Sequence, residues 1–236
     1  VGMSYTLRQA EQHELSRRDL RQLAFLPYDY TAHRVALGYA RHWAILALAL
    51  AATAAAQLAW GCPLLSAGVA ACVPLYAYAH SRAFDWLVIQ RGQPDYWDFA
   101  AAWRLPHRVY VAECDSSKRL IGVVCLQHRP DGSCDLQHAA VVASRRRGGV
   151  GSGLVRLALT EAGRLGYSRV TMYSTTVQAA AVAMYKRLGI GVDRVHSDGV
   201  SKRIPFLPKP FAYVRMSAEL GKQGGPECLP ESHKDC

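Results

Sequence analysis

The stretch Arg145-Arg-Arg-Gly-Gly-Val-Gly-Ser-Gly153 decides how this chain is interpreted. It follows an apolar run at 135–143 that predicts a strand, and it precedes residues 154–165, whose apolar positions have helical spacing. A glycine-rich turn that opens a helix presents bare backbone N–H groups at the positive end of the helix dipole. We therefore predict that residues 146–152 bind a phosphate group.

Two common phosphate-binding motifs do not fit this stretch. A Walker loop requires a Lys followed by Ser or Thr after its last glycine, and no Lys is present here. A dinucleotide fingerprint requires G-x-G-x-x-G and an acidic residue at the end of the next strand. Gly149, Gly151 and Gly153 are spaced differently, and the next strand ends at Ser174 without an acid. A nucleotide-hydrolase loop and a dinucleotide fold are therefore disfavoured.

Composition limits the remaining classes of protein. The chain has 236 residues, of which 50% are hydrophobic and 19% charged, which excludes intrinsic disorder. Its seven cysteines are scattered without a C-x-x-C pair, so a structural zinc site or a disulfide framework is disfavoured, and we predict no metal. The net charge of +10 favours an anionic partner, but the chain has no nucleic-acid-binding motif. We therefore expect no nucleic acid among its partners.

Alternating and helical patterns predict an α/β (α+β) core at residues 108–220. Strands are expected at 108–114, 120–127, 135–143, 169–174 and 211–220. Helices are expected at 154–165 and 178–188, the second one ending at Gly189. Together they predict a mixed central sheet flanked by helices. The preceding segment, 83–107, is a connector, and residues 221–236 have the composition of a flexible tail.

The N-terminal part contains a strand, a helix and then a long apolar segment. Residues 1–42 predict a short strand at 5–8 and a helix over 11–23, with no cleavable signal peptide. Residues 43–82 include a run, 43–79, without a charged side chain, which is nearly twice the length of one spanning helix. Gly61-Cys62-Pro63 near its centre predicts two helices, roughly 43–60 and 64–80, joined by a turn.

We interpret this segment as a membrane hairpin. Arg34 and Arg41 precede it, Arg82 and Arg91 follow it, and the turn has no Lys or Arg. By the positive-inside tendency both flanks face the cytosol, so the hairpin would enter the bilayer from that side. A single kinked span and a pair of buried soluble helices remain the alternatives.

Two motifs give the chain a resemblance to a known family. They are Arg146-x-x-Gly149-x-Gly151 and Ala181-x-x-Met184-Tyr185-Lys186-x-x-Gly189. Both resemble motifs of the GNAT superfamily of acetyltransferases, the first one being its acetyl-CoA diphosphate loop. With the hydrophobic segment placed after a strand and a helix, the chain looks like the camello-like membrane N-acetyltransferases. Ile190, Arg147 and the stretch 196–210 depart from the family pattern.

The resemblance implies a fold, a co-substrate and roles for individual residues. It implies the GNAT fold with acetyl-CoA as acetyl donor, backbone amides of Val141 and Val142 facing the thioester, and Tyr185 as general acid. The residues expected to bind acetyl-CoA are Val141, Val142, Arg146, Arg147, Gly148, Gly149, Val150, Gly151, Ser152 and Gln178.

The general base is left open by the sequence. Asp135 lies six residues before Val141, and His138 lies three residues before it and has a suitable intrinsic pKa. Glu113 is a third candidate, and a chain of water molecules is a fourth.

These observations together predict an enzyme. We expect a membrane-bound N-acetyltransferase that moves the acetyl group of acetyl-CoA to a primary amine of an amino acid, a cysteine S-conjugate or a protein lysine. The resemblance implies that the protein is located in the endoplasmic reticulum membrane. The arginines on both sides of the apolar segment predict that the catalytic part faces the cytosol. The alternative is a membrane-anchored acyl-CoA-binding protein without catalytic activity.

Overall fold

The computed structural model describes residues 4–40, 43–61, 63–84, 93–197 and 212–220. Its strands form one sheet in the order β1-β2-β3-β4-β5-β7-β6. The strands are β1 (Tyr5–Gln9), β2 (Arg108–Cys114), β3 (Leu120–His128), β4 (Ser133–Val141), β5 (Arg169–Thr175), β6 (Gly191–Ser197) and β7 (Ala212–Glu219). The longer helices are α1 (Arg18–Ala40), α2 (Trp43–Trp60), α3 (Pro63–Phe84), α6 (Val150–Arg164) and α7 (Ala179–Arg187). Short helical segments are η1 (Gln12–Ser16), α4 (Pro94–Trp97), α5 (Phe99–Ala102), η3 (Ala143–Arg145) and η4 (Thr176–Gln178).

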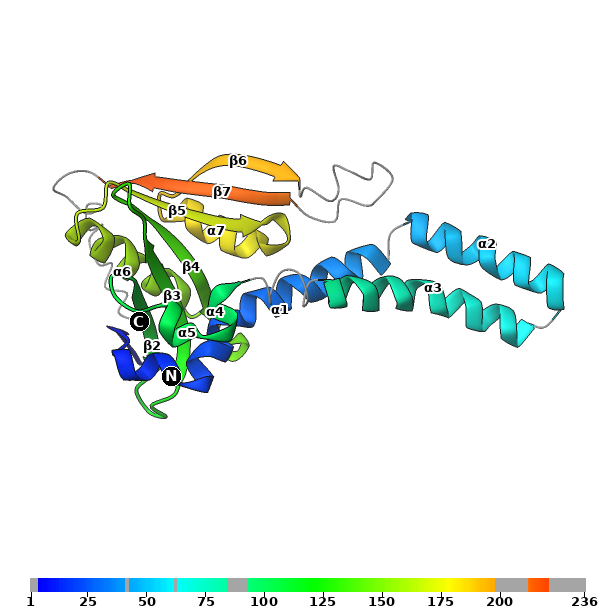
Figure 1. Ribbon diagram of the computed structural model, residues 1–236, viewed down its shortest axis with the longest axis horizontal. Helices are drawn as coiled ribbons and strands as arrows, with labels where there is room; N and C mark the ends of the chain where they lie inside the picture. The colour runs from blue at the N-terminus through cyan, green and yellow to red at the C-terminus, as the bar shows by residue number, and fades with distance from the viewer. Residues whose placement is uncertain (1–3, 41–42, 62, 85–92, 198–211, 221–236) are drawn as a thin grey trace, which may run out of the picture.

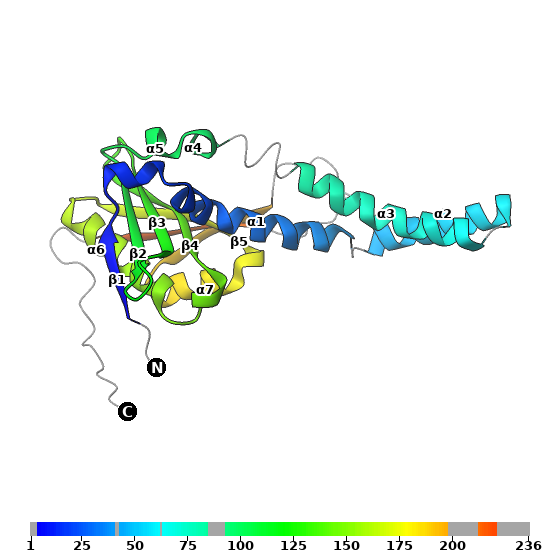
Figure 2. The ribbon, with the colours of Figure 1, turned by 90° about the horizontal axis from the view of Figure 1, so that it is seen from below.

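Helices cover both faces of the sheet (Figures 1 and 2). On one face, Leu154, Val155 and Ala158 of α6 pack with the core that also contains Tyr185 of α7. On the other face, α1 and α5 pack through a second core that includes Leu20 and Phe99. The central strands are apolar on both faces because both are covered; seven consecutive residues of β3 are buried.

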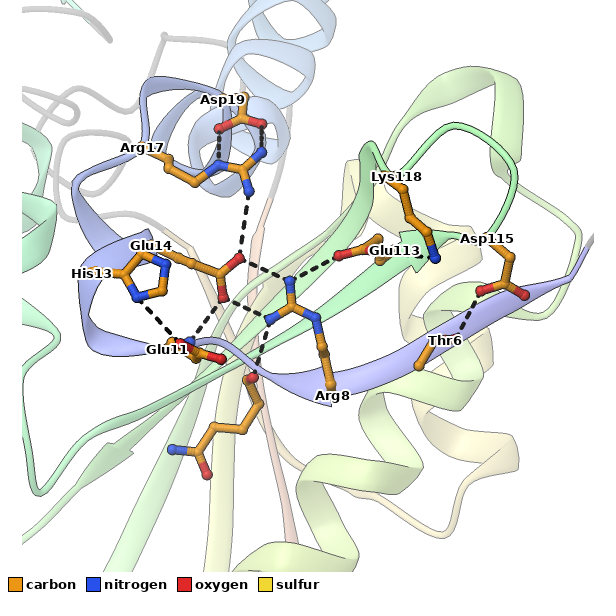
Figure 3. Close-up of polar contacts among 11 residues, drawn as sticks. Thr6, Arg8, Glu11, His13, Glu14, Arg17, Asp19, Glu113, Asp115 and Lys118 are labelled. Carbon is orange, nitrogen blue, oxygen red and sulfur yellow. Dashed lines mark hydrogen bonds and ion pairs between the residues drawn. The ribbon is translucent and has the colours of Figure 1, made fainter.

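Charged side chains attach the N-terminal segment to the sheet (Figure 3). The carboxylate of Glu14 in η1 is buried and accepts hydrogen bonds from both terminal nitrogens of Arg8, at 2.6 and 2.8 Å. Arg8 also donates to Glu113 of β2 at 2.8 Å. These hydrogen bonds lower the pKa of Glu14 to about 2, although burial alone would raise it. The ion pairs therefore connect β1, η1 and β2.

The apolar segment forms a helical hairpin that extends away from the sheet (Figures 1 and 2). Ser66 of α3 donates to the side chain of Gln57 of α2 at 2.8 Å, and Gly61 has the positive φ of +61° that reverses the chain. Large apolar side chains are exposed along it, including Leu58 at 89% and Leu64 at 84%. Within the described ranges, no helix is both long and apolar enough to span a bilayer. The expectation of a transmembrane helix is therefore not supported there.

Most predicted elements are present, with shifted ends. The helix expected at 154–165 begins at Val150, because the glycines after Gly149 form its first turn. The strand expected at 135–143 ends at Val141, because Ala143–Arg145 turn into η3. α1 continues through Pro27 to Ala40, well beyond the predicted 11–23. β6 was not predicted. The expected tail, 221–236, and residues 198–211 lie outside the described residues.

Candidate active site

Strands β4 and β5 separate where the predicted site lies. Residues 133–136 of β4 pair in parallel with residues 169–172 of β5, and the pairing stops there. β5 remains paired with β7 as far as Thr175, so β4 is the strand that departs (Figure 1). The carboxyl ends of β4 and β5 are thus separated by a gap. Ligands of sheets with parallel strands commonly bind at such a position.

A bulge in β4 marks this departure. His138 has a positive φ of +50°, and the pairing of β4 with β3 shifts register between Val123 and Cys125. After the bulge, Val142 donates its N–H to the carbonyl of Ile121 on β3 at 3.0 Å. Because successive residues of a strand direct their backbone groups to opposite sides, the N–H of Val141 points toward the gap beside β5. Val141 and Val142, whose amides were both expected to face the thioester, therefore differ: only Val141 can donate there.

The glycine-rich loop is exposed beside this gap. Residues Arg146–Gly149 are exposed, and Gly149 is the N-cap of α6 with a φ of +81°. The N–H of Gly153 is donated to the Gly149 carbonyl at 2.9 Å, so the preceding amides of the first turn have no intrahelical acceptor. Arg146 folds back so that its Nε donates to the Val141 carbonyl at 3.0 Å. The predicted phosphate-binding loop thus adjoins the end of β4.

Gly151 lies where three elements converge. A Cβ atom added there would be 3.4 Å from Met184 Sδ of α7 and 3.5 Å from Val141 Cγ2 of β4. A larger side chain would therefore fill the space between the start of α6, the end of β4 and α7. Gln178, at the start of α7, accepts a hydrogen bond from Ser174 at the end of β5 at 3.0 Å. This places Gln178 at the end of the neighbouring strand.

Tyr185 belongs to the core between α7 and the sheet. It is buried, and burial raises its pKa to about 12. It therefore keeps its proton at neutral pH, as a general acid must before it acts. Its neighbour Met184 reaches Gly151, so this turn of α7 borders the gap.

His138 is held at both ring nitrogens. Its Nε2 lies 2.6 Å from Asp95 Oδ2, and its Nδ1 lies 3.2 Å from the carbonyl oxygen of Ala24. The side chain is 1% exposed, and it is surrounded by rings that include Phe25 and Trp103. A general base needs a free nitrogen lone pair, so this geometry argues against that role for His138.

The two carboxylates considered as bases are also engaged elsewhere. Asp135 forms an ion pair with Arg129 near the start of β4, about 20 Å along the strand from Val141. Glu113 is paired with Arg8 at 2.8 Å and lies 3.9 Å from Lys118. The structure does not bring Asp135 or Glu113 to the gap.

A hollow on the β3 side of β4 adds positive charge near the loop. It has a volume of about 550 Å³. Its lining residues are Ser117, Arg119, Leu120, Ile121, Val142, Ser144 and Arg145. Ser117 and Arg119 were not predicted as site residues, because only the fold places the turn after β2 beside η3. In the described part of the chain, no cluster of three metal-ligating side chains was found.

The geometry fits a thioester carrier with a diphosphate. The exposed loop offers amides and arginines for the phosphates, a side chain larger than a methyl group at Gly151 would fill the space beside it, and the Val141 amide faces the gap. The model of the acetyltransferase (GNAT) family matches residues 75–190. This region belongs to the GNAT family. The chain is accordingly an acetyl-CoA-dependent N-acetyltransferase, and acetyl-CoA is its co-substrate.

Solved structures similar to the GNAT domain are distant in sequence. One is the ribosomal-protein-S18-alanine N-acetyltransferase from Escherichia coli, with 18% identity, a TM-score of 0.46, and coverage of 57% of this chain and 81% of that one. Another is the spermidine N-acetyltransferase from Vibrio cholerae in complex with CoA and spermine, with 15% identity, a TM-score of 0.48, and coverage of 92% and 96%. No curated protein matches the chain.

Proposed function

We propose that the chain is a membrane-associated N-acetyltransferase of the camello-like kind, acting on a primary amine of an amino acid, a cysteine S-conjugate or a protein lysine. The observation that carries the proposal is the Val141 N–H directed into the gap where β4 leaves β5, next to the exposed glycine loop. Acetyl-CoA supplies an activated acetyl group whose carbonyl carbon the amine attacks.

Each part of the site has a role in this reaction. The loop at Arg146–Ser152 binds the diphosphate through first-turn amides and arginine charge. The Val141 N–H donates to the thioester carbonyl oxygen and stabilises the negative charge that develops there. Tyr185 holds a proton at neutral pH and donates it to the leaving sulfur. Since His138, Asp135 and Glu113 are engaged, the amine proton passes to water.

Membrane association is proposed from the hairpin. Its exposed leucines, Leu46, Leu48, Leu50, Leu58, Leu64 and Leu75, lie on α2 and α3, away from the sheet. Lipid would cover this apolar surface while the hairpin dips into one leaflet without crossing the bilayer. Arg34 is exposed on α1, the helix that precedes the hairpin. Its positive charge would be attracted to anionic lipids on the cytosolic surface of an endoplasmic reticulum membrane.

The activity is tested by acetyl transfer from labelled acetyl-CoA. Detergent-solubilised protein is incubated with amino acids, cysteine S-conjugates and lysine peptides, and labelled products are separated. We expect transfer to one of these classes and none with Gly149→Glu. Binding of acetyl-CoA without transfer to any amine would overturn the proposal in favour of the non-catalytic alternative.

The membrane role is tested separately with vesicles. Protein is sedimented with phosphatidylcholine vesicles containing about 20% phosphatidylserine. Leu50→Glu with Leu58→Glu should release it, because a charge in the apolar layer is costly. Leu105→Glu, at an exposed leucine of the catalytic domain, is the matched control and should stay bound. Equal binding of both variants would refute insertion of the hairpin.

A further inference from the structure

His138 joins three segments that are far apart in the sequence. Its ring lies between Ala24 of α1, which precedes the hairpin, and Asp95 of α4, which follows it, while its backbone is part of β4. The indole N–H of Trp103 donates to the same Asp95 Oδ2 at 3.0 Å. One buried imidazole therefore fixes β4 to both chain segments that flank the hairpin.

Both ring nitrogens of His138 have a polar partner at this contact. A carbonyl oxygen faces one of them and a carboxyl oxygen faces the other. Burial alone would raise the pKa of Asp95, but the hydrogen bond and charge of His138 and the bond from Trp103 lower it. Asp95 and His138 thus form a buried hydrogen-bonded pair, and losing one member leaves a buried polar group of the other without its partner.

This hydrogen-bonded pair holds the residue at which β4 is distorted. His138 adopts a left-handed backbone at the bulge, and Val141 follows three residues later. A left-handed non-glycine residue is strained and persists only when its surroundings hold it. The aromatic rings around the imidazole, Phe25 at 5.0 Å and Trp103 at 5.5 Å between centroids, leave it little room to turn.

We propose that Asp95 and His138 are positioning residues for acetyl transfer: by clamping the β4 bulge they direct the Val141 N–H at the thioester carbonyl. This inference rests on the proposed function, in which that N–H stabilises the reacting oxygen. Neither side chain touches the reacting atoms. Their effect is on turnover, because the diphosphate loop, which sets the affinity for acetyl-CoA, begins at Arg146, beyond the bulge.

The variants are Asp95→Asn, which removes the charge, and His138→Asn, which keeps a residue that tolerates the left-handed backbone. We expect each to lower kcat by about 10–100-fold, since a small misplacement of a catalytic group has effects of this size. The Kd for acetyl-CoA, measured by calorimetry, should change by less than about threefold. The double variant should be no slower than the slower single variant, because the residues act as a unit.

A second readout does not depend on turnover. In protein labelled with ¹⁵N-valine, the Val141 amide resonance is assigned by its loss in Val141→Ile and followed as acetyl-CoA is added. We expect a shift in the wild type and a clearly smaller one in both variants. His128→Asn and Asp193→Asn, which change the same residue types elsewhere in the sheet, should leave kcat and this shift unchanged.

The outcomes separate the inference from the proposed function. Unchanged kcat, or a Val141 shift equal to that of the wild type, would overturn the positioning role. A drop in kcat that merely follows loss of folded protein in thermal melts would also overturn it. A wild-type protein that acetylates no amine would refute the proposed function, and the Val141 resonance would still decide whether the clamp directs this amide.

Discussion

Gly122 of β3 lies directly beneath Leu154 of α6. A Cβ atom on Gly122 would come within 2.7 Å of Leu154 Cδ1 and within 3.2 Å of the Ala140 carbonyl oxygen. The Leu154 side chain can lie this close to β3 only because residue 122 has no side chain. Since α6 begins at the glycine loop, this contact also fixes where the loop stands relative to β4.

Replacing this glycine should destabilise the protein. Gly122→Ala forces Leu154 or the helix to move, and we expect a loss of about 1–3 kcal/mol in the free energy of unfolding. Chemical denaturation measures the loss. Gly163→Ala is the control: it lies in the same helix with nothing within 4 Å of the added Cβ, so it should be neutral or slightly stabilising. Equal stability of the two variants would show that the contact is not tight.

Charged side chains in the loop should abolish binding of acetyl-CoA. Gly149→Glu adds a carboxylate and a strained left-handed residue, and Gly151→Glu fills the space between Val141 and Met184. Calorimetry should detect no acetyl-CoA binding by either variant. Gly132→Glu, with a φ of +78° in a remote turn, carries the same backbone strain and should bind normally. Normal affinity in the loop variants would refute the assigned diphosphate site.

Removing the hydroxyl of Tyr185 should slow turnover. Tyr185→Phe keeps the packing of α7 but removes the proton donor, so kcat should fall by about 10²-fold or more while the Kd for acetyl-CoA stays the same. Because the pKa of Tyr185 is about 12, the rate should show no titration of this group between pH 6 and 9. Tyr167→Phe, which removes a hydroxyl bound to His128, is the control. A fully active Tyr185→Phe enzyme would exclude the tyrosine as the acid.

The ion pairs at Glu14 predict loss of stability in acid. The pKa of Glu14 is lowered from 4.5 to about 2 in the folded protein, so its contribution is fully present above pH 4.5. That contribution disappears as the pH falls toward 2. Glu14→Gln should therefore lower the free energy of unfolding by up to about 3 kcal/mol at pH 7. Between pH 5 and 2 the free energy of unfolding of this variant should fall less steeply than that of the wild type. The exposed Glu11→Gln serves as the control, and an identical acid profile for both would contradict this assignment.

The local patterns of this sequence predicted the parts that local chemistry determines. An alternating pattern predicted β2, a continuous apolar run predicted β3, and the glycine-rich turn predicted the start of α6 beside the end of β4. β6 was missed because it is an exposed edge strand whose charged residues, such as Asp193 and Arg194, hide its pattern.

Local sequence patterns could not predict contacts between residues that are far apart in the chain. Nothing within a few residues of His138 indicates that Asp95, 43 positions earlier, holds its ring. Asp135 looked suitable as a base by sequence distance, but the extended strand carries it away from Val141. The separation of β4 from β5, which makes the site, depends on the pairing of whole strands.

The pairing of β1 with β2 has a consequence for how the chain is made. Tyr5 lies opposite Cys114, so β1 finds its partner only after more than a hundred further residues have been translated. By then both helices of the hairpin, α2 and α3, have been translated. β1 can therefore join the edge of the sheet only after the hairpin has left the ribosome.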